Sequence, residues 1–177
     1  KEVAPERNPG MYLVPQILTN QVKGFLDAVD ALYQRGYREI NLNLGCPSGT
    51  VVSKGRGSGF LREPDKLDCF LEQVFSEISV RNYPEKVRIS LKTRLGIREP
   101  EEFSEILKVY NRYELEEVII HPRVQKDFYK KPVRMEFFEM AVNESKNPVC
   151  YNGNIFSAED YKEFVQKYPQ ISSVMLG

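Results

Sequence analysis

Short apolar segments with strand-like patterns alternate with amphipathic segments of helical spacing along this chain of 177 residues. The strand-like segments are 11–19, 38–44, 87–93, 117–121, 148–152 and 172–176, and the helix-like segments are 21–34, 64–78, 100–110, 137–142 and 157–165. The connections are short, and no linker, repeat or low-complexity segment interrupts them. Such alternation is typical of a parallel sheet covered by helices. The chain is therefore predicted to be an α/β protein, with either an open doubly wound sheet or a closed barrel.

Polar residues fall at or just beyond the carboxyl ends of the predicted strands. They are Gln16, Cys46, Lys92, His121 and Asn152. In (β/α)8 barrels the active site is assembled at this end of the strands, which favours the barrel. Six units cannot close the usual eight-stranded barrel. The sequence therefore predicts a TIM-barrel fragment with six of the eight βα units over residues 1–177.

The segment 39–61 combines a strand with a glycine-rich loop that carries a cysteine. Apolar residues alternate with Asn41 and Asn43, and this period of two indicates a buried strand. Two asparagines on one face of an interior strand need hydrogen-bond partners, and a ligand is one source of them. The glycines allow the backbone to approach whatever lies above the strand end. Cys46 is therefore a candidate nucleophile, metal ligand or acid.

Bulk composition excludes several classes of function. The net charge is zero, so any surface that attracts nucleic acid must be local. Three cysteines with no paired spacing argue against a disulfide framework or a zinc site, and no metal site is expected. Cys69, in the apolar stripe of a predicted helix, and Cys150, inside a predicted strand, are expected to be packed and inert. No apolar run approaches the roughly 20 residues of a membrane span, and the first residues lack the apolar core of a signal peptide, so a cytoplasmic protein without a membrane partner is expected.

Several short motifs occur together in a recognisable order. They are Asn43-Leu44-Gly45-Cys46-Pro47 with Gly57-Ser58-Gly59-Phe60-Leu61-Arg62, Leu91-Lys92-Thr93-Arg94-Leu95-Gly96, His121-Pro122-Arg123, Asn152-Gly153-Asn154-Ile155 and Val174-Met175-Leu176-Gly177. In order and spacing, from Gln16 onward, they resemble the flavin-dependent tRNA-dihydrouridine synthases. The resemblance implies part of an FMN-binding TIM-barrel catalytic domain. The first two strands of that barrel, and a helical tRNA-binding domain after it, are expected to lie outside this chain.

The same resemblance implies the reduction of uridine to 5,6-dihydrouridine in tRNA, with NAD(P)H as the reductant. Hydride would pass from flavin N5 to C6 of uracil, and Cys46 would give a proton to C5. A thiol has an ordinary pKa of about 8.5 and is mostly protonated at neutral pH, so it can serve as the acid. The target base would be flipped out of the tRNA to reach the flavin.

The resemblance also implies which residues hold FMN. They are Gln16, Lys92, His121, Asn152, Gly153, Asn154 and Gly177. Lys92 would place a fixed cation beside the flavin, where it stabilises the negative charge of the reduced ring. Gln16 and His121 are expected at the ring, and the last two loops at the phosphate. From the residues alone, Lys92 could instead snorkel to solvent, and His121 could be a packed histidine.

Basic residues gather in the loops after the predicted strands, with Phe128 and Tyr129 among them. They are Lys54, Arg56, Arg62, Arg94, Arg98, Arg123, Lys126, Lys130, Lys131 and Arg134. A neutral chain can thus present a basic face to RNA phosphates and aromatic surface to an unstacked base, although loops are also charged simply because they are solvated. By the resemblance, tRNA contacts are expected from Asn43, Lys54, Arg56, Arg94 and Arg123. The full-length protein is expected to be monomeric.

Two other functions are compatible with parts of the pattern. A flavin barrel that acts on a free pyrimidine, like the dihydroorotate dehydrogenases, also has a cysteine in a strand-end loop. That function predicts Asn-x-Ser-Cys-Pro instead of Asn-Leu-Gly-Cys-Pro, and it leaves the basic loops unexplained. The second is a barrel fragment that binds RNA without turnover. Ser48-Gly49-Thr50 is a departure from the family, whose members often have a lysine a few residues after the cysteine.

Overall fold

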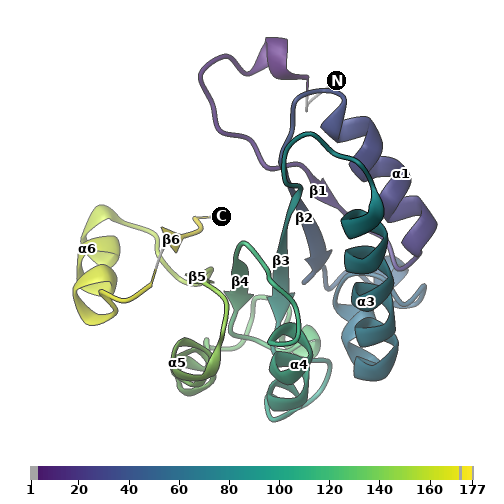
Figure 1. The fold of residues 1–177 in the computed structure, drawn as a ribbon. Helices are drawn as coiled ribbons and strands as arrows, with labels where there is room; N and C mark the ends of the chain where they lie inside the picture. Colours follow the sequence, from purple (N-terminus) through teal and green to yellow (C-terminus); the bar gives the residue numbers. More distant parts are fainter. Residues whose placement is uncertain (1–3, 172, 177) are drawn as a thin grey trace.

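The computed structural model describes residues 4–171 and 173–176, which form a curved parallel sheet with helices along its outer side (Figure 1). The strands are β1 (Gln16–Ile17), β2 (Glu39–Leu44), β3 (Arg88–Arg94), β4 (Val118–His121), β5 (Val149–Tyr151) and β6 (Ser173–Val174). They lie in the order β1-β2-β3-β4-β5-β6, and each neighbouring pair is parallel. All six predicted strands are therefore present in the described ranges.

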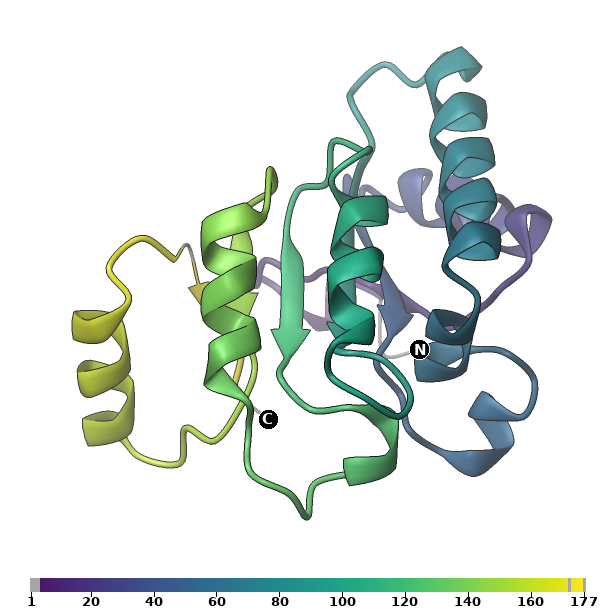
Figure 2. The same ribbon diagram turned by 90° about the horizontal axis from the view of Figure 1, so that it is seen from below.

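The five predicted helices are also present, and each connects two consecutive strands. They are α1 (Val22–Tyr33), α3 (Pro64–Val80), α4 (Glu102–Tyr110), α5 (Met135–Glu144) and α6 (Ala158–Lys167). Figure 2 shows α4 and α5 side by side against the sheet. Shorter helical segments lie in the loops: η1 (Pro5–Arg7), α2 (Gly49–Val52), η2 (Gly57–Arg62) and η3 (Gln125–Asp127). Among the residues that the structure describes, no helix has the length and apolar character needed to cross a membrane.

The strand order distinguishes between the two architectures that the sequence allows. A doubly wound sheet reverses its strand order at a switch point and has helices on both faces. Here each strand pairs with the next one in the sequence, and the connecting helices all lie on the convex side (Figure 1). This arrangement is that of part of a (β/α)8 barrel, so the predicted fold class is confirmed.

The two faces of the sheet differ sharply in polarity. Successive side chains of a strand point to opposite faces. In β2, the side chains of Ile40 and Leu42 are fully buried toward the helices. Asn41 and Asn43 alternate with them, and the strand register places these two asparagines beside the Ser90–Lys92 segment of β3. The hydrophobic core therefore lies between sheet and helices, while polar groups of β2 and β3 line the concave face.

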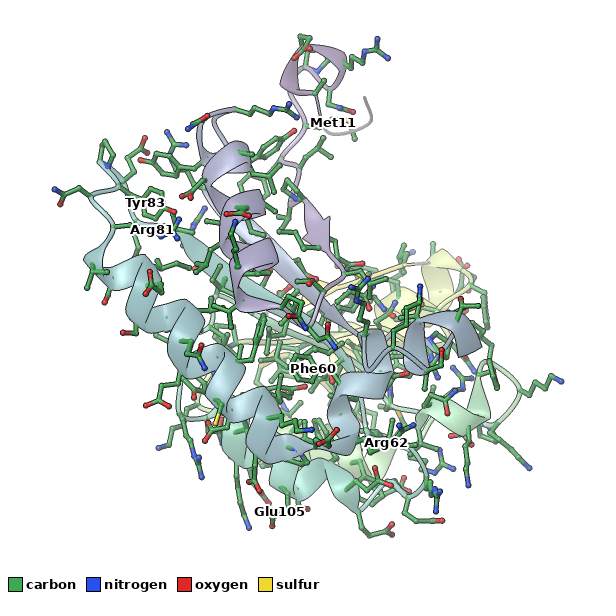
Figure 3. The ribbon with its side chains drawn as sticks, turned by 90° about the vertical axis from the view of Figure 1, so that its right-hand side faces the viewer. Met11, Phe60, Arg62, Arg81, Tyr83 and Glu105 are labelled. Atoms are coloured by element: carbon green, nitrogen blue, oxygen red, sulfur yellow. The ribbon has the colours of Figure 1, made fainter. Side chains whose placement is uncertain are left out.

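The loop after β2 contains more structure than the predicted glycine-rich loop. It forms α2 and η2, and Phe60 of η2 packs against Phe70 of α3 with 5.4 Å between ring centroids. Figure 3 shows Phe60 lying between η2 and α3, at the end of α3 opposite to Arg81 and Tyr83. At that other end, Arg81 and Tyr83 both donate hydrogen bonds to the carboxylate of Asp30 in α1. Helix α3 is thus anchored to η2 at one end and to α1 at the other.

Three local predictions differ from the structure. Among the described residues, the predicted strand 172–176 contributes only Ser173 and Val174 to the sheet. The predicted strand 11–19 contributes only Gln16 and Ile17 to the sheet. Pro15, which precedes them, has no N–H for a neighbouring strand, and only its carbonyl pairs, with the Asn41 N–H at 2.9 Å. Cys69, predicted in the apolar stripe of α3, is exposed, whereas Cys150 is buried as expected.

Candidate functional site

A cavity of about 450 Å³ lies at the carboxyl ends of the strands, on the concave face of the sheet. It is lined by Gln16, Asn43, Gly45, Cys46, Pro47, Lys92, Arg94, His121, Arg123, Tyr129, Asn152, Gly153, Asn154, Phe156 and Met175. Its size is within the usual range for sites that bind small molecules or cofactors. Most residues predicted for the site therefore line one cavity, although they are up to more than 100 residues apart in the sequence.

Three of the predicted site residues are not part of this lining. Lys54 lines a separate hollow between the starts of α1 and α3. Arg56 donates from its Nε to the side-chain oxygen of Asn20 at 3.5 Å. Gly177, predicted for the phosphate grip, lies outside the residues that the structure describes.

Cys46 is held by hydrogen bonds to its backbone from both sides. The side-chain oxygen of Asn43 accepts from the N–H groups of Gly45 and Cys46 at 3.0 and 2.9 Å. The carbonyl of Cys46 accepts from the N–H and the hydroxyl of Ser58 at 3.1 and 2.9 Å. Since these bonds use only its backbone, the half-buried thiol is left at the cavity wall.

Gly57 shows why this loop needs glycine. Its φ of +55° favours glycine. A Cβ added there would lie 2.8 Å from the carbonyl oxygen of Cys46 and 2.9 Å from the Cys46 Cβ. The close approach that the sequence predicts for the glycines is therefore an approach to the cysteine itself.

The two asparagines of β2 find their partners inside the protein. Gln16 Nε2 donates to Asn41 Oδ1 at 2.8 Å, and Asn43 Nδ2 donates to Gln16 Oε1 at 2.7 Å. Asn41 also donates to the hydroxyl of Ser90 at 3.0 Å. A ligand was one possible source of partners for these asparagines, and in the structure β1 and β3 supply them.

Lys92 projects from the middle of β3 into the cavity. Its Nζ donates to Asn152 Oδ1 at 2.6 Å, and Asn152 Nδ2 donates to the Met175 carbonyl at 3.0 Å. Burial, followed by the nearby Arg94 guanidinium, lowers the pKa of the Lys92 ammonium from its ordinary value. The ammonium is therefore fixed in the cavity wall and does not snorkel to solvent.

His121 is a buried, neutral histidine. Burial is the largest cause that lowers its pKa, to about 4, and the positive charges of Arg94, Lys92 and Arg123 add to it. Its Nε2 lies 3.0 Å from a guanidinium nitrogen of Arg123, and its ring meets the edge of the Tyr129 ring at 5.7 Å between centroids. At neutral pH this imidazole carries no charge.

Two buried arginines support the loop that follows β4. Arg94 donates to the carbonyls of Val124 and Phe128 at 3.1 and 2.7 Å, and to that of Gly45 at 2.9 Å. Arg123 donates to the carbonyl of Lys131. These side chains are only 1% and 4% exposed, so the structure gives them internal partners. Their predicted contact with substrate stays a prediction.

With its arginines buried, the same loop exposes lysines and aromatic rings. Lys126, Phe128, Tyr129, Lys130 and Lys131 are all exposed, and we refer to them as the basic aromatic loop. Among the described residues, none of its three lysines has a hydrogen-bond or ion-pair partner for its ammonium group. The Tyr129 ring also lies 5.1 Å from the Arg94 guanidinium and lines the cavity.

Sequence reasoning did not assign Tyr129, Phe156 or Met175 to the cavity. Phe156, which is 82% exposed, follows the Asn-Gly segment at a strand end, and a large apolar residue beside such a loop is the signal that could have identified it. Met175 contributes its backbone carbonyl to Asn152, which no side-chain pattern reveals. Within the described ranges, no group of three or more His, Cys, Asp or Glu residues is arranged to hold a metal ion.

Comparison with known proteins identifies chains similar to this one. The family model described as dihydrouridine synthase matches residues 2–177. A probable tRNA-dihydrouridine synthase of Staphylococcus aureus is 29% identical over 171 residues, which is 93% of this chain and 49% of the relative. The tRNA-dihydrouridine(16) synthase of Pseudomonas syringae is 28% identical over 123 residues, 70% of this chain and 37% of the relative. The chain spans about half the length of the first of these relatives, and less of the second.

Proposed function

Because this chain belongs to the dihydrouridine synthase family, we propose that its cavity is where FMN and a uridine of tRNA meet in the complete protein. That protein would reduce the uridine to 5,6-dihydrouridine, with NAD(P)H as the reductant. One observation carries the proposal: the thiol of Cys46, the ammonium of Lys92 and the imidazole of His121 line the same cavity. A cytoplasmic location and a monomeric full-length protein are part of the same proposal.

The donor groups of the cavity fit FMN. An ammonium group has three donors, and Asn152 Oδ1 takes one donor of Lys92, which leaves others for the oxygen and nitrogen atoms of a flavin ring. The fixed positive charge of Lys92 suits a ring that becomes negative on reduction. Gln16 adds an exposed side-chain amide to the cavity lining. The glycine at position 153 has no side chain that could obstruct a ligand. A side chain would not fit there, because its Cβ would clash with the hydroxyl of Tyr151.

Cys46 would be the proton donor. Reduction of the C5=C6 bond of uracil needs a hydride at one carbon and a proton at the other. Bound FMN, once reduced, supplies the hydride to C6. The Cys46 thiol would then give its proton to C5. The resulting thiolate would be protonated again from solvent, which restores the thiol for the next turnover. The backbone bonds to Asn43 and Ser58 support this role, since they hold the thiol in place without using it.

His121 is unsuited to the same proton transfer. With a pKa of about 4, His121 is a neutral imidazole at neutral pH. It lacks the second, acidic ring proton that a general acid would donate. Lys92 is held by Asn152 and serves as a charge. Of the groups on the cavity wall, Cys46 is therefore the best placed acid.

The basic aromatic loop supports tRNA as the substrate. Tyr129 of this loop lines the cavity, and the exposed lysines near it in the sequence can contact RNA phosphates. Tyr129 and Phe128 offer aromatic rings to an unstacked base. A free pyrimidine would need neither feature. This loop therefore favours a polynucleotide over the smaller substrate of a dihydroorotate dehydrogenase.

The proposal is tested with the purified full-length protein and two matched cysteine variants. Cys46→Ala is expected to bind FMN as the wild type does but to reduce uridine in tRNA about 100-fold more slowly or worse, because the proton donor is missing. Cys69→Ala changes an exposed cysteine outside this cavity and should keep both properties. Loss of FMN binding in Cys46→Ala would indicate a structural role, and failure of the wild type to bind FMN would refute the proposal.

A further inference from the structure

The single histidine of the sequence has its ring in contact with a buried arginine. We propose that Arg123 is a positioning residue that locks the His121 ring in the tautomer with its proton on Nδ1. The existence of this lock follows from the geometry alone. Its consequence for catalysis rests on the function proposed above.

The chemistry of the two groups fixes the direction of their hydrogen bond. A guanidinium group has five N–H donors and no acceptor, and it stays protonated in proteins. Since Arg123 Nη1 lies 3.0 Å from His121 Nε2, Nε2 must accept, and the proton of the neutral ring must be on Nδ1.

Arg123 cannot easily turn away from this contact. Its Nη2 donates to Asn154 Oδ1 at 3.0 Å, and its Nε donates to the Lys131 carbonyl. The three contacts use separate nitrogen atoms of one planar group, so they fix its orientation. Because Arg123 is only 4% exposed, water competes little for these donors.

The surroundings of His121 reinforce the neutral form. Lys92 and Arg94 face the ring from β3, and Arg123 faces it from the loop after β4; all three are positive and disfavour a charged imidazolium. A backbone hydrogen bond with Asn152 acts in the opposite sense and is the smallest of these effects. Tyr129 contributes only the edge contact of its ring.

The lock has a consequence for the proposed reaction. With Nε2 occupied and the ring neutral, His121 neither gives nor takes a proton during turnover. Proton transfer is therefore carried out by Cys46. The positive charge beside the proposed flavin site comes only from groups that stay protonated, and His121 adds none. In this role Arg123 acts on the reaction through His121 and the loop, which differs from the predicted contact with tRNA.

The test uses nitrogen NMR of ¹⁵N-labelled full-length protein without a histidine tag. In residues 1–177, His121 supplies the only imidazole, and Arg123→Met identifies its signals if the longer chain adds others. The wild type is expected to show one static Nδ1–H tautomer that stays neutral from pH 7 to pH 5. Arg123→Met should mix the tautomers and raise the pKa of His121 by about one unit or more, since a positive charge is removed. Arg98→Met, a change at an exposed arginine, should give the wild-type spectrum.

Two results would overturn the proposal. One is an Nε2–H or averaged tautomer in the wild type, and the other is an unchanged tautomer in a folded Arg123→Met. If Arg123→Met does not fold, Asn154→Ala removes one anchor of Arg123 and leaves His121 untouched; it should also increase tautomer mixing, and an unchanged spectrum would count against the lock. None of these spectra requires FMN or tRNA, so their outcome is separate from that of the proposed function.

Discussion

At the scale of single residues, the site depends on keeping one histidine neutral among three cations. His121 has a folded pKa of about 4 against an ordinary value of 6.5. Between these values the unfolded chain binds a proton that the folded protein does not bind, so the free energy of unfolding falls as pH falls. The stability associated with His121 is therefore complete above pH 6.5 and is lost progressively toward pH 4.

This linkage gives a measurable prediction. From pH 7 to pH 5, His121 should cost the full-length wild type roughly 2 kcal/mol of unfolding free energy. Denaturant unfolding of the wild type and of His121→Gln at both pH values isolates this contribution, because other titrating groups are common to both proteins. Equal losses of stability in the two proteins would contradict the buried, neutral histidine.

The residues at strand ends were predictable from the sequence, and the partners of the arginines were not. Gln16, Cys46, Lys92 and His121 could be brought together because the carboxyl ends of parallel strands meet at one edge. Arg94 and Arg123 looked like exposed loop cations, since several of their acceptors are backbone carbonyls of the loop after β4. Every residue has a backbone carbonyl, so the residue type does not show which carbonyls will accept a hydrogen bond. The burial of the two arginines could therefore not be predicted.

At the scale of elements, the segment between β2 and α3 positions the cysteine. Helices α2 and η2 fold this segment back until Gly57 touches Cys46 and Gly59 touches Val52. A Cβ at position 59 would lie 2.6 Å from the Val52 carbonyl oxygen. Gly57 therefore allows the segment to approach the cysteine-bearing turn closely, and Gly59 allows it to pack against α2.

A pair of matched glycine substitutions tests this role. Gly57→Ala should lower the unfolding free energy by roughly 1–3 kcal/mol, because it combines a positive φ with a clash at Cys46, and it should slow uridine reduction. Gly49→Ala has nothing within 4 Å of the added Cβ and should change neither property. Thermal unfolding and the reduction rate provide the measurements. Wild-type behaviour of Gly57→Ala would show that the close approach is unimportant.

The sequence predicted helix ends well where residues that begin or end a helix mark them. Gly36, with φ of +93°, follows α1, and Ser157 and Asp160 form the predicted capping box of α6. Helices α2 and η2 were missed because glycine-rich segments have low helical propensity. In this segment, packing of Phe60 against α3 overrides that propensity.

At the scale of the whole molecule, a chain of zero net charge presents a basic surface beside one cavity. Several lysines on the convex side and at the opposite end of the sheet are paired with acids, as Lys23 is with Asp27 and Lys86 with Glu114. Lys130 and its neighbours in the basic aromatic loop have no such partners among the described residues. The position of the unpaired cations, and not their number, supports an RNA-binding face.

Two triple variants of equal charge test this distinction. Changing Lys126, Lys130 and Lys131 to Gln should weaken tRNA binding by the full-length protein. It should also reduce the slope of log K against log salt concentration by about 0.7–0.9 for each lost phosphate contact. The same change at Lys23, Lys86 and Lys108, whose partners are acids, should have little effect. Equal weakening by both variants would mean that only net charge matters.

The overall architecture followed from the sequence because alternation of strands and helices allows few folds. Six strand-like and five helix-like segments left a doubly wound sheet or a barrel, and the polar strand ends favoured the barrel. The observed order β1 to β6, with helices along one face, agrees with that choice. Lys54 could not be placed correctly, because the position of a loop residue around the barrel mouth depends on the folding of the loop.

The most direct test of the central claim is the dihydrouridine content of tRNA from cells that lack the full-length protein. We expect dihydrouridine to disappear from at least one tRNA position. The wild type and Cys69→Ala should restore it, and Cys46→Ala should not, because only Cys46 lies at the proposed reduction site. Unchanged dihydrouridine in the deleted cells, or full restoration by Cys46→Ala, would contradict the assignment of this cavity as a uridine-reducing site with Cys46 as its acid.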